Sequence, residues 1–186
     1  MSIPQLVGII GSFNRPSKTY VLAEHIASLI GERHAVETEL YDLTDVGPSL
    51  GRALWRKDLD EQARRIVDAV VSADVLIVGS PTYKGSYPGL FKHLFDLIDP
   101  HELKGKPIIL TATGGGDRHA LVVEHQLRPL FGFFSAQTLP TAVYASDVDF
   151  KDYNVAPSRL AARLDDLLSD VANIFSALDA RIDYAA

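Results

Sequence analysis

The stretch QLVGIIGSFNRPSKT, residues 5–19, decides the fold of this chain. It begins with a short apolar run, residues 5–10, which predicts a buried β-strand. Gly11 ends this run and opens a polar loop that reaches Thr19. An amphipathic helical pattern follows, with Gly31 as a suitable stop and with one apolar face made of Leu22, Ile26, Leu29 and Ile30. The order of strand, loop and helix is typical of α/β domains.

The same alternation continues along the chain. Four further apolar runs predict strands at residues 34–43, 75–78, 107–112 and 139–145, and the run at 75–78 is expected to break at Gly79, Ser80 and Pro81. Amphipathic patterns predict helices at residues 59–70 and 90–98, from about residue 118, and at residues 160–178. The polar segments 44–60 and 146–157 are interpreted as surface loops. We therefore predict one three-layer, doubly wound α/β domain over residues 1–186, with a five-stranded parallel sheet between helices.

The composition limits the kinds of partner. The net charge of -6 and the pI of about 5.4 argue against nucleic acids and anionic membranes, because these attract clustered Lys and Arg. The chain has no Cys, so disulfides, thiol nucleophiles and iron–sulfur clusters are excluded, and redox chemistry would need a bound cofactor. The apolar run near the N-terminus is too short for a signal peptide or a membrane span. A cytoplasmic location is the expectation.

Ligands of such sheets bind beyond the carboxyl ends of the strands, so the loops there carry the candidate site. The first loop places hydroxyl and amide side chains, two cations and a helix N-terminus together, which suits a phosphate monoester. Its candidate contacts are Ser12, Asn14, Arg15, Ser17, Lys18 and Thr19. The glycine patterns of dinucleotide and nucleoside triphosphate sites are absent. The alternative is that Ser17 only caps the helix and that both cations are solvated.

The second and third loops favour a flat ligand. The stretch SPTYKGSYPG, residues 80–89, offers backbone and aromatic edges, and its candidate contacts are Pro81, Thr82, Tyr83, Lys84, Gly85 and Ser86. The run TGGG lets backbone N–H groups approach the heteroatoms of a ligand, and its candidate contacts are Thr113, Gly114, Gly115 and Gly116. The alternatives are an ordinary turn with surface tyrosines and a flexible turn.

These loops, with the stretches PTYKGSYPGLFKHLFDLI (residues 81–98) and ATGGGDRHAL (residues 112–121), resemble the NAD(P)H-dependent FMN reductases of flavodoxin-like fold. The resemblance covers nearly the whole chain and is strongest to the reductase components of two-component alkanesulfonate and methanesulfonate monooxygenases. It implies strand order 2-1-3-4-5, FMN and NADH or NADPH as cofactors, a flavin-dependent monooxygenase as partner, and a homodimer or homotetramer.

The resemblance also implies roles for individual residues. Ser12, Ser17, Lys18 and Thr19 would hold the FMN phosphate, and residues 81–84 and 113–115 would border the ring. Many members of the family carry Arg where this chain has Asn14, whereas Arg15 is displaced by one position. The resemblance therefore does not place Arg15 on the phosphate.

The fourth predicted helix contains a defect. Pro129 has no N–H for the carbonyl group of His125, so the helix must kink or change register, and a π-bulge is one solution. His125 matches the place of an inserted aromatic residue in the sulfonate reductases, where the bulge lies beside the flavin at a subunit interface. By that resemblance His125 would tune how tightly flavin is held. The alternative is an ordinary helix residue at the surface. Phe131, Phe133 and Phe134 follow as an aromatic cluster, either core or interface.

The resemblance implies that hydride passes from the reduced nicotinamide to N5 of FMN, so the flavin performs the chemistry and no catalytic side chain is expected. No metal site is expected, because His119 and His125 do not share one helical face. The predicted function is an FMN reductase that supplies reduced FMN to a monooxygenase in organosulfonate sulfur assimilation. The alternatives are an FMN-retaining quinone, azo-dye or chromate reductase and a flavodoxin-type electron carrier.

Overall fold

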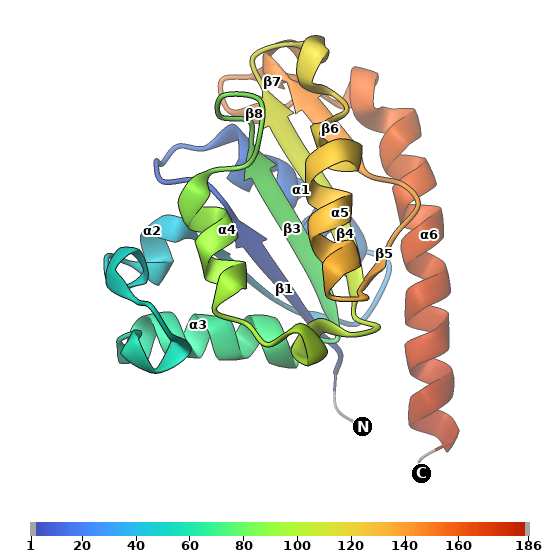
Figure 1. The fold of residues 1–186 in the computed structure, drawn as a ribbon. Helices are drawn as coiled ribbons and strands as arrows, with labels where there is room; N and C mark the ends of the chain where they lie inside the picture. Colours follow the sequence, from blue (N-terminus) through green and yellow to red (C-terminus); the bar gives the residue numbers. More distant parts are fainter. Residues whose placement is uncertain (1–2, 185–186) are drawn as a thin grey trace.

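A parallel sheet runs through the middle of the computed structural model, which describes residues 3–184 (Figure 1). Its long strands are β1 (Gln5–Ile10), β2 (Glu37–Asp42), β3 (Val75–Pro81) and β4 (Pro107–Gly114). They lie in the order β2-β1-β3-β4, and β4 then pairs with two short strands, β5 (Gln137–Thr138) and β6 (Val143–Ser146). This confirms the predicted doubly wound topology, with the fifth strand position divided in two.

The division of the fifth strand contradicts the prediction of one strand at residues 139–145. Pro140 lies in the gap and has no N–H for the ladder. The carbonyl oxygens of Leu139 and Pro140 accept hydrogen bonds from the Arg128 guanidinium, at 2.8 and 3.2 Å. The arginine thus pairs with the carbonyl groups of this segment, while the Leu139 N–H still donates to the Ile108 carbonyl oxygen of β4 at 2.9 Å.

The predicted break of the third strand was also wrong. β3 continues through Gly79 and Ser80 to Pro81, which lies opposite Thr113 of β4. Although Pro81 cannot donate, the next residue does, because the Thr82 N–H reaches the Thr113 carbonyl oxygen at 2.7 Å. The ladder therefore survives the proline.

Helices cover both faces of the sheet (Figure 1). α1 (Lys18–Gly31) and α6 (Pro157–Tyr184) pack on one face, where Leu6 and Ile10 of β1 point. On the other face, where Val7 and Ile9 of β1 point, lie α3 (Glu61–Ser72), α4 (Gly89–Asp96) and α5 (Arg128–Phe133). The alternation along β1 places one core on each side, which gives three layers. No helix within residues 3–184 is long and apolar enough to cross a membrane.

The segments interpreted as surface loops hold regular structure. Residues 44–60 include most of α2 (Leu43–Val46), and residues 146–157 include the antiparallel hairpin of β7 (Phe150–Lys151) and β8 (Asn154–Val155). Short 3-10 turns lie at Leu50–Arg52, Arg56–Asp58, Pro100–Leu103, Asp117–His119 and Asp147–Asp149. These elements are too short to produce a periodic pattern.

The fourth predicted helix is broken into pieces. After the 3-10 turn Asp117–His119, a π-helical segment at Val123–Leu127 leads into α5. The aromatic cluster that follows is divided: Phe131 and Phe134 are buried in the core, whereas Phe133 is 72% exposed.

Candidate functional site

The loop between β1 and α1, residues 11–17, forms one wall of a cavity of about 280 Å³. Ser17 caps α1 by accepting from the Tyr20 N–H at 3.2 Å. Thr19 is buried in the first turn of α1, where its hydroxyl group hydrogen bonds to that of Thr113 at 2.6 Å. The cavity is lined by Ser12, Asn14, Pro16, Ser17, Lys18, Thr19, Pro81, Tyr83, Thr113 and Tyr153.

The chemistry of this cavity fits a phosphate group. Ser12 is only 3% exposed, and its Oγ has no hydrogen-bond partner within residues 3–184. A buried hydroxyl group normally has a partner, so the unpaired Ser12 Oγ fits a ligand oxygen. The N-terminus of α1 adds backbone N–H groups and the positive end of the helix dipole. A volume of about 280 Å³ leaves room for a phosphate monoester.

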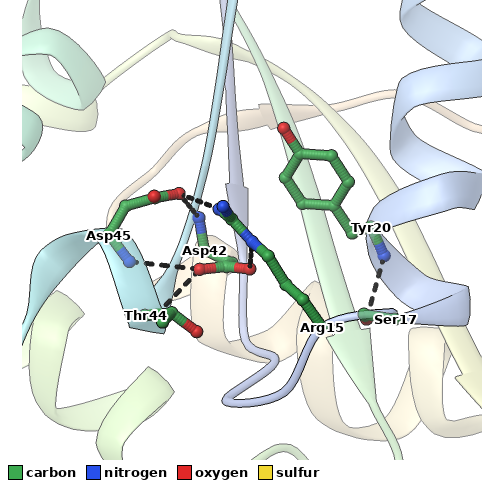
Figure 2. Close-up of polar contacts among 6 residues, drawn as sticks. All are labelled: Arg15, Ser17, Tyr20, Asp42, Thr44 and Asp45. Atoms are coloured by element: carbon green, nitrogen blue, oxygen red, sulfur yellow. Dashed lines mark hydrogen bonds and ion pairs between the residues drawn. The ribbon is translucent and has the colours of Figure 1, made fainter.

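Both cations of the loop are engaged by carboxylates. Lys18 Nζ lies 2.8 Å from Asp147 Oδ1, in the turn after β6. Arg15 Nε lies 2.8 Å from Asp42 Oδ2, and Arg15 Nη2 lies 2.5 Å from Asp45 Oδ2 (Figure 2). The hydrogen bond to Asp42 raises the pKa of the Arg15 guanidinium above its ordinary value. Neither cation is therefore simply solvated. Lys18 lines the cavity, whereas Arg15 is not among the described residues that line it.

The loop after β3 begins with a tight two-residue turn. Tyr83 and Ser86 exchange backbone hydrogen bonds, with Lys84 and Gly85 between them at φ of 53° and 86°. Two positive φ values at the tip are typical of a type I′ turn. The Tyr83 ring stacks on Phe13 of the first loop, with centroids 6.2 Å apart, so an aromatic platform adjoins the cavity.

Two hydroxyl groups of the same segment differ in their partners. Thr82 Oγ1 is buried and makes no hydrogen bond to the described part of the chain. Ser86 Oγ donates to Gln126 Oε1 at 2.9 Å and so ties the turn to the π-helical segment.

The run TGGG is only half loop, because Thr113 and Gly114 are the last residues of β4. Tyr144 of β6 packs against this run, and its hydroxyl group donates to the Gly116 carbonyl oxygen at 2.7 Å. A Cβ atom at Gly114 would lie 2.4 Å from the Tyr144 hydroxyl oxygen, so a larger residue at this position would displace the tyrosine hydroxyl group. The tyrosine thus anchors the backbone of this run at the Gly116 carbonyl group.

The π-helical segment confirms the predicted defect before Pro129. The Arg128 N–H donates to the Val123 carbonyl oxygen, five residues back, as in a π-turn. The Arg128 side chain also pairs with Glu124, and this hydrogen bond lowers the pKa of the Glu124 carboxyl group. His125 is exposed and lines two hollows: one of about 490 Å³ between α4 and α5, and one of about 170 Å³ beside Gly85, Arg118 and His119.

Comparison with known proteins identifies the family. Residues 4–151 match the family model described as NADPH-dependent FMN reductase. The chain belongs to this family. An FMN reductase (NADPH) of Pseudomonas aeruginosa is 46% identical over 160 residues, which cover 86% of each chain. The NADH-dependent FMN reductase SfnF of Pseudomonas fluorescens is 47% identical over 165 residues, which cover 88% of each chain. A solved structure of an oxidoreductase from Corynebacterium diphtheriae is 28% identical, with a TM-score of 0.80 over 92% of this chain and 96% of the other.

Family membership confirms the prediction that the protein is an NAD(P)H-dependent FMN reductase with FMN and a nicotinamide nucleotide as cofactors. The structure gathers the first-loop residues of the reductase, apart from Arg15, with Pro81, Tyr83 and Thr113 around one cavity. Gly85 and His125 line a separate hollow. No group of three or more His, Asp or Glu side chains placed to hold a metal occurs within residues 3–184.

Several residues at the site carry no signal in the periodic patterns. Asp42 and Asp45 engage Arg15, Asp147 engages Lys18, and Tyr153 lines the cavity from the β7–β8 hairpin. Asp42 is the last residue of β2, and the others follow the carboxyl end of β2 or β6, the edge at which ligands of parallel sheets bind. Applying that rule to the loops after the second and fifth strands would have found them.

Proposed function

We propose that this reductase delivers reduced FMN to a separate flavin-dependent monooxygenase, in the assimilation of sulfur from organosulfonates. The ion pair between Lys18 and Asp147 carries the proposal. A cation already held by a carboxylate attracts a phosphate weakly, so the site favours flavin that arrives and leaves over flavin kept permanently. The resemblance to reductase components of sulfonate monooxygenase systems supports the choice of partner.

The residues around the cavity have distinct roles in the proposal. The Ser12 hydroxyl group and the backbone N–H groups at the start of α1 would hold the phosphate. Residues 81–86 and 113–116 would border the flavin ring. Bound FMN supplies the hydride acceptor, and the protein orients it. No side chain is needed as an acid or a base.

The reductase activity is tested by following flavin absorbance after the protein is mixed with FMN and a reduced nicotinamide nucleotide. We expect catalytic amounts of the protein, with FMN and either NADH or NADPH in the absence of oxygen, to abolish the absorbance of oxidised flavin. Ser12→Ala should raise the KM for FMN, because the phosphate loses a donor, while the exposed control Ser72→Ala should match the wild type. Unchanged flavin absorbance with both nucleotides would refute the reductase activity.

Delivery is tested against retention by the colour of the purified protein. A delivering reductase should emerge from gel filtration colourless and should saturate with added FMN. A quinone, azo-dye or chromate reductase that retains its flavin should emerge yellow, with one FMN per chain. The second result would overturn delivery and leave the reductase activity intact.

We also propose that the protein forms a homodimer or homotetramer through the hollow between α4 and α5. That hollow is largely apolar, and Phe133 lies 72% exposed at its wall. Exposed aromatic groups beside an apolar hollow are typical of contact surfaces. Sedimentation equilibrium should give a mass two or four times that of the chain.

A further inference from the structure

Arg15 connects the β1–α1 loop to the end of a different strand (Figure 2). Its guanidinium bridges Asp42, the last residue of β2, and Asp45 of α2, at 2.8 and 2.5 Å. Beside this bridge the guanidinium also lies over the Tyr20 ring, 5.3 Å from its centroid. One arginine from the loop therefore contacts β2, α2 and α1.

A backbone contact joins the same two regions. The Leu43 N–H, at the start of α2, donates to the Ser12 carbonyl oxygen at 3.1 Å. The β2–α2 corner, residues 42–45, thus touches the loop at Ser12 and again at Arg15. Phe13 and Asn14 lie between these two contacts, and Asn14 lines the cavity, so the corner fixes the chain on both sides of this lining residue.

The carboxylates commit the arginine to this place. The Asp42 side chain is fully buried, and its Oδ1 caps α2 by accepting from the Thr44 and Asp45 N–H groups. Its Oδ2 accepts from Arg15. A buried carboxylate is strongly destabilised when its charged partner leaves. Arg15 therefore stays with the corner rather than turning to a ligand.

We propose that Arg15 is a positioning residue, which clamps the β1–α1 loop onto the β2–α2 corner and so holds Ser12 and Asn14 ready for a phosphate monoester. It does this without touching the phosphate. A loop that is ordered before binding loses less conformational entropy when the ligand arrives, and affinity rises accordingly. The inference rests on the proposed FMN site.

The experiment compares FMN with riboflavin, which lacks the phosphate, by quenching of flavin fluorescence without nucleotide. The variants are Arg15→Ala, Asp45→Asn and the double variant. Asn at position 45 keeps an oxygen for the Asp42 N–H, so it removes the charge and spares the helix cap. We expect the Kd for FMN to rise about tenfold with Arg15→Ala and about threefold with Asp45→Asn, with riboflavin nearly unchanged.

The double variant measures the coupling between the two side chains. A clamp predicts a Kd for FMN close to that of Arg15→Ala alone, because the second change removes nothing more. Arg15→Lys should recover part of the loss, since one ammonium group can reach one carboxylate. Arg33→Ala, which removes the same charge beyond the far end of α1, should match the wild type.

Three results would overturn the clamp. If Arg15→Ala weakens FMN binding while Asp45→Asn leaves it unchanged or strengthens it, Arg15 acts on the phosphate directly. If the ratio of the FMN and riboflavin affinities is unaltered in all variants, the bridge only stabilises the fold. A wild type that binds both flavins equally has no phosphate site for a clamp to serve. Absence of turnover with NADH and NADPH would instead refute the reductase activity and leave the clamp standing.

Discussion

At the scale of single residues, the ion pair between Lys18 and Asp147 governs how strongly the cavity attracts an anion. Lys18 is the first residue of α1 and lines the cavity, while Asp147 follows β6. The pair is half-exposed, and such pairs contribute little to the stability of the fold. Its effect on a phosphate is larger, because the ligand must compete with the carboxylate for the same ammonium group.

We therefore predict that Asp147→Asn tightens FMN binding. The substitution releases Lys18 for the phosphate and removes one negative charge near it, so the Kd for FMN should fall about threefold or more. The Kd for riboflavin should change little, and added salt should reduce the gain in affinity for FMN.

Asp152→Asn is the matched control for this prediction. It makes the same charge change in the neighbouring hairpin, at an exposed residue whose φ of 49° asparagine tolerates. A Kd for FMN that rises in Asp147→Asn, or falls equally in the control, would contradict the role given to this ion pair.

The residue-level picture was only partly accessible from the sequence. The hydroxyl groups and cations of the first loop predict an anion site, because they surround a helix N-terminus. The ion pairs of the two cations cannot be predicted from the sequence, because Asp42 and Asp147 approach Arg15 and Lys18 only once the sheet is assembled. Each cation is held by a carboxylate that is distant in sequence, and this alters its role at the site.

At the scale of elements, the π-helical segment Val123–Leu127 sets the geometry around His125. The defect was predictable because Pro129 has no N–H, which is a local property of the sequence. The divided fifth strand was less accessible: Pro140 hints at it, but the hydrogen bonds from Arg128 belong to the tertiary structure. Arg128 is thus the residue that directly follows the π-helical segment and also the donor to the carbonyl groups between β5 and β6.

Deleting His125 should remove the extra residue of the π-helical segment and return the helix to the i→i−4 register, while Pro129 still leaves one carbonyl group without an N–H partner. If the bulge favours flavin release, the deletion variant should purify yellow and turn over free FMN more slowly. The variant His125→Ala keeps the chain length, so its colour and turnover separate the effect of the side chain from that of the extra residue.

Pro129→Ala offers a second route to the same end, since it restores an N–H to the helix. Circular dichroism and thermal melting would establish that each variant folds. Colourless protein with unchanged turnover from both folded variants would show that the bulge does not govern release.

At the scale of the whole molecule, the site exists only where separate segments meet at the carboxyl edge of the sheet. The cavity takes residues from the β1–α1 loop, the ends of β3 and β4, and the β7–β8 hairpin. The first three followed from the rule for parallel sheets, because strand order and crossover direction fix where their loops converge. The hairpin did not, since its strands are two residues each and leave no periodic signal.

A ligand that joins these segments should stabilise the entire fold. A ligand at 100 times its Kd adds about 2.7 kcal/mol to the free energy of unfolding. For a chain of this size, each kcal/mol raises Tm by about 2–4 °C, so saturating FMN should raise it by about 5–10 °C.

Riboflavin at the same concentration should raise Tm less, because it cannot reach the Ser12 hydroxyl group and the start of α1. Ser12→Ala should reduce the shift with FMN and leave the shift with riboflavin unchanged. Equal shifts with both flavins in the wild type would show that the phosphate contributes nothing, and that the cavity at the start of α1 lies outside the flavin site.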